Sequence, residues 1–229
     1  KDMAKYIELC IQDTLGYKGI QIGGRLNHDL CSPEDKFSIK CWSYTYATFN
    51  EIPSNVRWFV ANCSINEPNV TPIPIGLNGE EALNKISQYN LIEKKKLLYL
   101  NFRFTTTERV NLYKYYTTQR WATVKEKIDY DEYLNDLSEH IFCLCPVGNG
   151  IESYRIWEAL YMGCYPVVSF DIDTAQMSAW HLPITFSYNL LTIDPDCLFK
   201  IIPEMKLNPK KWMQLSNWKD FILAKEDTI

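Results

Sequence analysis

Residues 142–168 read FCLCPVGNGIESYRIWEALYMGCYPVV, and this stretch decides the fold. It begins with an apolar run and continues through a loop that holds two glycines. It then shows the spacing of an amphipathic helix before a second apolar run. A strand, a loop, a helix and another strand, joined by short connections, are typical of a parallel α/β sheet. Ligands of such sheets bind beyond the carboxyl ends of the strands, where the glycine loop lies.

The same alternation extends over most of the chain. Apolar runs and helical spacings predict strands at 97–101, 122–128, 140–145 and 165–170, with helices at 107–118, 130–139 and 150–162. The ends are less regular: strands are expected at 38–46, 57–61 and 71–75, and helices at 3–14, 80–89, 195–204 and 209–224. The sequence thus predicts an α/β fold whose second half is the better formed.

The composition excludes several classes of function. The 229 residues include 24 basic and 28 acidic side chains, so no basic excess exists to coat a nucleic acid. No stretch approaches the roughly 20 apolar residues of a membrane span, and none is expected in this chain. Eight cysteines without Cys-x-x-Cys spacing argue against structural zinc and for reduced thiols, which favours the cytoplasm. Two glycosylation triplets, at 62–64 and 69–71, keep a lumenal domain open as the alternative.

The glycine loop and the next helix carry residues suited to a phosphorylated ligand. Gly148 and Gly150 let the backbone approach a ligand closely, and the free N–H groups of a helix N-terminus favour phosphate. Arg155 and Glu158 share one helix face, where arginine suits a diphosphate and a carboxylate accepts from vicinal ribose hydroxyls. The alternative is a surface ion pair at i, i+3, worth a few tenths of a kcal/mol.

The run 142–168 resembles the nucleotide-sugar motif of exostosin-like glycosyltransferases. The resemblance rests on Pro-x-Gly-Asn-Gly at 146–150, on Arg155, on Glu-Ala-Leu at 158–160 and on Gly-Cys-x-Pro-Val-Val at 163–168. Two further segments resemble the same family more loosely: 58–62 with 72–77, and 98–102 with Arg109.

The resemblance implies a GT-B architecture, in which two Rossmann-like domains face each other. The acceptor-side domain would cover 1–94 and be short or reduced. The donor-binding domain would cover 95–229, with terminal helices that pack back on the first domain. A charged run at 93–96 marks the expected boundary.

The resemblance also implies a reaction and the residues that serve it. The chain would move a sugar from a nucleotide-sugar donor to a glycan or other hydroxyl-bearing acceptor. Arg155 would neutralise the diphosphate and Glu158 would hold the ribose. Arg103 or Arg109 would add a second positive charge, and the phosphate pocket would be lined by Gly148, Asn149, Gly150 and Ser153. No divalent metal or cofactor is expected, because arginines, the helix dipole and N–H groups stabilise the leaving group.

The catalytic base is expected in an N-terminal loop. The family is generally inverting, so a base in the cleft would deprotonate the acceptor hydroxyl. His28 and Asp29 lie in a glycine-preceded loop, where GT-B enzymes often place this base. The alternative for His28 is a loop turn with a solvated imidazole. His140 and His181 are further candidates, although His140 precedes a buried strand and suits capping or packing.

Other functions stay open at this point. Asp171 and Asp173 form an Asp-x-Asp pair, which in the other glycosyltransferase class holds a divalent metal. A catalytically degenerate member of the fold would serve as a binding or scaffold protein. A fucosyltransferase-like enzyme would use a guanine-nucleotide sugar. A dinucleotide-dependent oxidoreductase is disfavoured, because no Gly-x-Gly-x-x-Gly follows the first strand.

Overall fold

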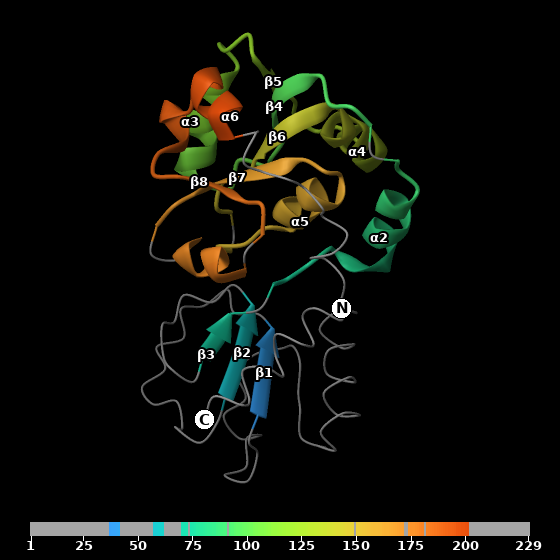
Figure 1. Cartoon of the computed structure of the whole chain (residues 1–229), viewed down its shortest axis with the longest axis vertical. Helices are drawn as coiled ribbons and strands as arrows, with labels where there is room; N and C mark the ends of the chain where they lie inside the picture. The colour runs from blue at the N-terminus through green and yellow to red at the C-terminus, as the bar shows by residue number, and fades with distance from the viewer. Residues whose placement is uncertain are drawn as a thin grey trace.

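The described part of this computed structural model contains two parallel β-sheets. The structure describes residues 37–41, 57–61, 70–72, 74–90, 92–148, 150–171, 174–180 and 182–201. The smaller sheet has the order β1-β2-β3, formed by Phe37–Cys41, Arg57–Ala61 and Val70–Pro72. Figure 1 shows it in the lower half of the molecule, below the larger sheet.

The larger sheet has five strands in the order β5-β4-β6-β7-β8. Its strands are β4 (Lys96–Leu100), β5 (Ala122–Val124), β6 (His140–Leu144), β7 (Tyr165–Ser169) and β8 (Thr185–Ser187), and all four pairings are parallel. The chain first adds β5 on one side of β4 and then returns to add β6 on the other. The strand order therefore reverses between β4 and β6, and doubly wound sheets bind their ligands at this switch point.

Helices cover both faces of the larger sheet. They are α2 (Gly79–Ser87), α3 (Thr107–Tyr116), α4 (Tyr130–Glu139), α5 (Tyr154–Tyr161) and α6 (Pro195–Ile201), with 3₁₀ turns η2 (Thr174–Trp180) and η3 (Leu190–Thr192). Leu98 and Leu100 face a core shared with α3 and α6, whereas Tyr99 between them faces a core shared with α4 and α5. This alternation follows from the two-residue period of a strand and gives a three-layer arrangement (Figure 1).

Lys94 ties two of these helices together at their carboxyl ends. Its Nζ donates to the carbonyl oxygens of Leu137 at 2.9 Å and Ser138 at 3.0 Å in α4, and to that of Met162 at 2.9 Å after α5. The last carbonyls of a helix lack intrahelical partners and carry the negative end of the dipole. One ammonium group therefore caps both helices and fixes α4 beside α5.

The α/β fold with a parallel central sheet agrees with the sequence prediction and is consistent with a Rossmann-like unit. The α4 bounds and the β2 bounds match the predicted ranges, whereas β5 ends at Val124 instead of 128. The short segments β8, η2 and η3 carry too few residues for a clear period and were not predicted. The expected helices 3–14 and 209–224 lie outside the described residues, and the domain boundary at 94/95 stays a prediction.

The predicted helix over 150–162 begins later than expected. In the structure α5 starts at Tyr154, with Ser153 in an extended conformation as its N-cap. The Glu152 side chain, just before this N-cap, accepts from the backbone N–H of Ile75 at 3.0 Å. A contact between residues 77 positions apart thus decides where this helix begins.

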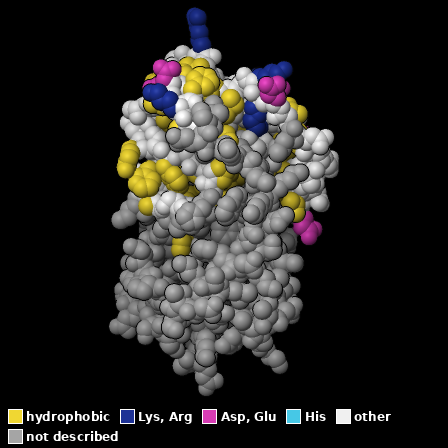
Figure 2. All heavy atoms as spheres, in the orientation of Figure 1, with side chains coloured by type: hydrophobic (Ala, Val, Ile, Leu, Met, Phe, Trp, Pro, Cys, Tyr) yellow, Lys and Arg dark blue, Asp and Glu magenta, His cyan; other side chains and the backbone are white. Residues whose placement is uncertain are grey.

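The surface of the described part mixes charges of both signs. Figure 2 shows basic and acidic side chains interspersed over the upper half of this face, with hydrophobic side chains among them. Within the described ranges, no helix is long and apolar enough to cross a membrane.

Candidate functional site at the switch point of the larger sheet

Loops that follow β4 and β6 bring most of the predicted donor-site residues to one edge of the sheet. Arg103 lies in the loop after β4, and Arg109 lies in the first turn of α3. Gly148, Gly150 and Ser153 lie in the loop after β6, where the N–H of Gly148 donates to the carbonyl of Gly150 at 3.2 Å. Both loops leave the carboxyl ends of adjacent parallel strands, so the switch point is lined by the residues that the sequence singled out.

Arg109 clamps the two loops to each other. Its side chain is 6% exposed and donates to three backbone carbonyls. The acceptors are Val147 at 3.0 Å from Nε, Arg103 at 3.1 Å from Nη1 and Pro146 at 2.9 Å from Nη2. Its guanidinium also lies 5.6 Å from the centre of the Phe102 ring. Arg109 is therefore first of all a structural link that shapes the loop, and its charge stays at the edge of the site.

Gly148 is required by this clamp. A Cβ built on it would collide with Nη2 of Arg109 and lie 2.9 Å from Cζ. An arginine end can normally move aside, but this one is held by three hydrogen bonds. The glycine predicted to allow close approach of a ligand thus first allows close approach of the buried guanidinium.

Arg155 differs from Arg109 because no hydrogen bond joins its side chain to the described residues. Its Nε is buried and has no hydrogen-bond partner in the described part of the chain, and no ion pair there includes Arg155. Its guanidinium lies 6.0 Å from the same Phe102 ring that contacts Arg109. Burial, followed by repulsion from Arg155, lowers the pKa of Arg109 to about 10. Two buried cations therefore approach each other without a paired carboxylate.

Ser153 adds a second unpartnered atom at the same place. It is the N-cap of α5, but its hydroxyl makes no capping bond. Its Oγ is buried and unpaired among the described residues. Buried polar groups are nearly always hydrogen-bonded, and Ser153 Oγ and Arg155 Nε are exceptions among the described residues. Arg109, Gly148, Ser153 and Arg155 are called the switch-point cluster below.

Glu158 is buried one turn beyond Arg155 and is not the exposed ion pair of the alternative interpretation. It is 9% exposed, and its partners are two tyrosine hydroxyls from α4. Tyr130 donates to Oε1 at 3.1 Å and Tyr133 donates to Oε2 at 2.9 Å. Burial raises the pKa of the Glu158 carboxyl, while the two hydroxyls and Arg155 act against that shift. The tyrosines were missed from the sequence, where only the helical pattern of α4 was visible.

Glu152 connects the glycine loop to the segment that leads from the smaller sheet. Its Oε1 accepts from the N–H of Ile75 and from Nε1 of Trp157. The side chain is 4% exposed, and burial raises its pKa to about 8. The carboxyl is therefore mostly protonated at neutral pH, and it holds the start of α5 next to residues that follow β3.

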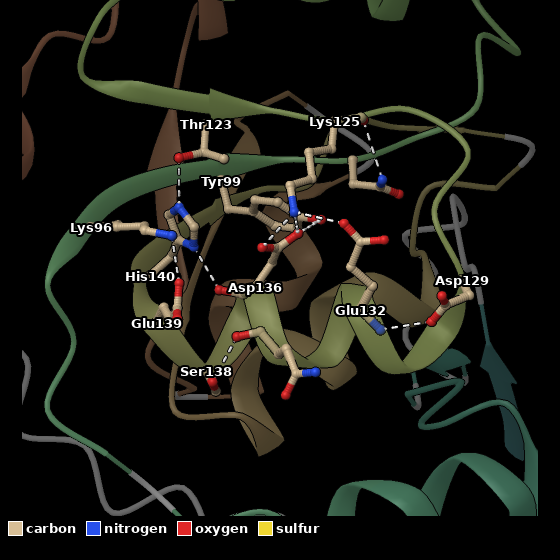
Figure 3. A network of polar contacts seen from close by, with 12 residues as sticks. Lys96, Tyr99, Thr123, Lys125, Asp129, Glu132, Asp136, Ser138, Glu139 and His140 are labelled. Carbon is tan, nitrogen blue, oxygen red and sulfur yellow. Dashed lines mark hydrogen bonds and ion pairs between the residues drawn. The ribbon is translucent and has the colours of Figure 1, made fainter.

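The remaining histidine and aspartate candidates fall into two groups. Four of them lie outside the described residues, so their roles stay predictions: His28, Asp29, Asp173 and His181. The same holds for Asn149 of the glycine loop. His140 is fully buried: Nδ1 lies 2.6 Å from the Asp136 carbonyl and Nε2 lies 2.8 Å from Thr123 Oγ1. Figure 3 shows it inside a polar network with Thr123 and Asp136, and both ring nitrogens have partners there, so packing is its role.

Asp171 is engaged in a local turn. Its Oδ1 accepts from the N–H of Thr174 at 2.8 Å, and its own N–H donates to Thr174 Oγ1 at 2.9 Å. This reciprocal pair starts η2. Among the described residues, no group of three or more His, Cys, Asp or Glu is arranged to hold a metal ion.

Comparison with known proteins supports a glycosyltransferase family. Residues 90–192 match the family described as the RXYLT1 C-terminal domain, which is of the exostosin-like glycosyltransferase type. The matched range contains β4 to η3, and with them the switch-point cluster and Glu158. No curated protein sequence matches the chain.

Proposed function

We propose that this chain is a glycosyltransferase that moves a sugar from a nucleotide-sugar donor to an acceptor hydroxyl, with inversion and without a divalent metal. The observation that carries the proposal is the pair of unpartnered buried atoms, Arg155 Nε and Ser153 Oγ, at the N-terminal end of α5. A diphosphate supplies acceptor oxygens for both, and it neutralises the two adjacent guanidinium groups.

The donor would occupy the switch point along α5. Its diphosphate would meet Arg155, Ser153 and the glycine loop at 148–150. Its ribose would meet Glu158, one turn further along the helix. This order matches the helix dipole, because the anionic end of the ligand lies at the positive end of α5.

The reaction would be a single displacement at the anomeric carbon. The acceptor oxygen forms a bond to that carbon while the bond from the carbon to the phosphate oxygen breaks. The electron pair leaves with the nucleoside diphosphate, whose growing charge the switch-point cluster stabilises. The acceptor proton passes to a base in the facing domain of a GT-B arrangement, for which His28 and Asp29 are our candidates.

Calorimetric titration with UDP and with GDP tests the donor site. We expect one of them to bind, and we expect Arg155→Ala and Glu158→Ala to abolish binding. Arg120→Ala is the matched control, because Arg120 is exposed and lies in the turn after α3. Unchanged binding in both site variants would refute the site. If the wild-type chain bound neither nucleotide, the proposal that it is a glycosyltransferase would be refuted.

A transfer assay tests the chemistry. Turnover of a bound nucleotide sugar in the presence of EDTA supports metal-independent transfer, and loss of turnover in EDTA would favour the Asp-x-Asp alternative. Nucleotide binding without turnover of any donor would favour a degenerate binding protein.

A further inference from the structure

Two tyrosine hydroxyls hold the Glu158 carboxylate, one on each oxygen. Tyr130 and Tyr133 come from the first turn of α4, and each donates its hydroxyl to a different carboxylate oxygen of Glu158. Their rings are stacked, with centroids 5.9 Å apart and an interplanar angle of 27°. The two donors are therefore set side by side before any ligand is present.

This geometry keeps the carboxylate a pure acceptor. Burial and the charge of Glu158 raise the pKa values of Tyr130 and Tyr133, so both phenols stay protonated donors at neutral pH. The other charged groups around the pair are Arg155 on α5, Glu81 and Lys85 on α2, and Asp131 on α4. Lys85 lies 5.6 Å from the centre of the Tyr130 ring and is paired with Asp131 at 2.9 Å. The hydroxyl bonds and Arg155 favour the ionised form of Glu158 against the effect of burial.

Two acceptor positions of Glu158 remain for a ligand. An ionised carboxylate has about four lone-pair sites, and the tyrosines use one on each oxygen. No third donor contacts Glu158 within the described ranges. Each oxygen thus keeps one free position, and the spacing between the two oxygens suits a pair of neighbouring hydroxyls.

We propose, on the premise that the site binds a nucleotide sugar, that Tyr130 and Tyr133 are positioning residues. They orient Glu158 toward both ribose hydroxyls and so make the site selective for ribonucleotides over deoxyribonucleotides. Tyr133 contributes more, because its ring is 6% exposed and its bond is shorter than that of the half-buried Tyr130.

The test compares UDP or GDP, whichever binds the wild-type chain, with its 2′-deoxy analogue. Tyr133→Phe removes one hydroxyl and keeps the ring, and we expect affinity for the ribonucleotide to fall about tenfold. Affinity for the deoxy analogue should change less than about twofold, because its contact to Glu158 is already incomplete. Tyr130→Phe should show the same pattern with a smaller loss.

The pH dependence of binding separates positioning from simple loss of packing. Removing a donor raises the pKa of Glu158. As the pH is lowered, the carboxylate should therefore be protonated, and nucleotide binding lost, at a higher pH than in the wild type. We expect the half-loss point to rise by about one pH unit in Tyr133→Phe. Tyr116→Phe is the control, because Tyr116 is equally buried but donates to the carbonyl of Leu190 on the opposite face of the sheet.

Each outcome has a distinct meaning. An equal loss for the ribo and deoxy ligands, or an unshifted pH profile in Tyr133→Phe, would overturn the positioning role while leaving the proposed function intact. A wild-type chain that binds neither UDP nor GDP would instead overturn the proposed function, and this inference with it.

Discussion

Two buried polar clusters meet the sheet at different places and differ in how completely their atoms are paired. The first, here the α4 network, joins Tyr99, Thr123, Lys125, Asp136 and His140 (Figure 3). Tyr99 donates to Asp136 at 2.9 Å, Lys125 pairs with the same carboxylate at 2.9 Å, and both ring nitrogens of His140 have partners. The second is the switch-point cluster, in which Arg155 Nε and Ser153 Oγ have none among the described residues.

The difference separates groups that hold the fold from groups that the proposed function assigns to ligand binding. Burial lowers the pKa of His140, so the ring is neutral; Nδ1–H donates to the Asp136 carbonyl, and Thr123 donates to Nε2. Such a satisfied network stabilises one arrangement of β4, β5, β6 and α4. An unsatisfied one costs free energy in the free protein, and binding recovers it.

The largest stability contrast is expected between the two arginines. Arg109→Met leaves three carbonyls without their donor and should lower the free energy of unfolding by about 3 kcal/mol. Arg155→Met removes a cation that forms no hydrogen bond or ion pair among the described residues and acts on Glu158 only through its charge, so it should cost less than about 1 kcal/mol. Urea denaturation measures both. If both variants lowered the free energy of unfolding equally, Arg155 would be as important for the fold as Arg109, which would contradict the different roles given to them.

Asp136→Asn should cost about 2 kcal/mol in the same measurement. Asparagine loses the charge that pairs with Lys125, and its NH₂ group must face either the Lys125 ammonium at the Oδ1 position or the Tyr99 hydroxyl at the Oδ2 position. Nucleotide affinity should fall less than in Tyr133→Phe, since Asp136 reaches the site only through Tyr99, whose ring lies 6.0 Å from that of Tyr133. A large loss of affinity in a folded variant would show that the α4 network also serves the site.

Glu152→Gln should flatten the pH dependence of stability. The pKa of Glu152 is about 8 in the fold against its ordinary 4.5, so folding favours the protonated form. The stabilisation is complete below pH 4.5 and is lost as the pH rises through 8. Wild-type stability should therefore fall relative to the variant by about 1.4 kcal/mol per pH unit between about pH 5 and 7.5. Parallel curves from denaturation at several pH values would contradict this.

Ser153→Ala is expected to have the smallest effect on stability. An N-cap serine usually contributes about 1 kcal/mol through its side-chain bond, but this serine makes none. The free energy of unfolding should change by less than about 0.5 kcal/mol, while affinity for the nucleoside diphosphate falls several-fold. A loss of about 1 kcal/mol in the free energy of unfolding without a change in affinity would instead mean that the hydroxyl stabilises the helix and does not bind the ligand.

Local patterns were enough wherever a segment's neighbours along the chain decide its structure. The α4 helix matches its predicted bounds because its N-cap is the preceding residue in the chain: the Asp129 side chain accepts from the Glu132 N–H at 2.8 Å. The start of α5 was predicted wrongly because Glu152 is directed by Ile75, far upstream. Single-sequence patterns carry no information on such contacts.

The site shows the same division. Arg155, Glu158 and the glycines are marked by their spacing on one loop and helix. The partners of Glu158, however, lie 25 and 28 residues upstream. Nothing in the spacing of Tyr130 and Tyr133 distinguishes them from core tyrosines, so only packing of α4 against α5 reveals their contact.

The sequence by itself determined the α/β class, the parallel strands of the second half and the loop that carries the phosphate-friendly residues, because strand and helix periods are local properties. Only the tertiary structure decided which buried groups are satisfied. It made Arg109 a clamp, left Arg155 Nε and Ser153 Oγ without a partner among the described residues, and placed two tyrosines on Glu158. Hydrogen bonds between distant segments depend on how helices pack on the sheet, and that packing is settled by the whole core at once.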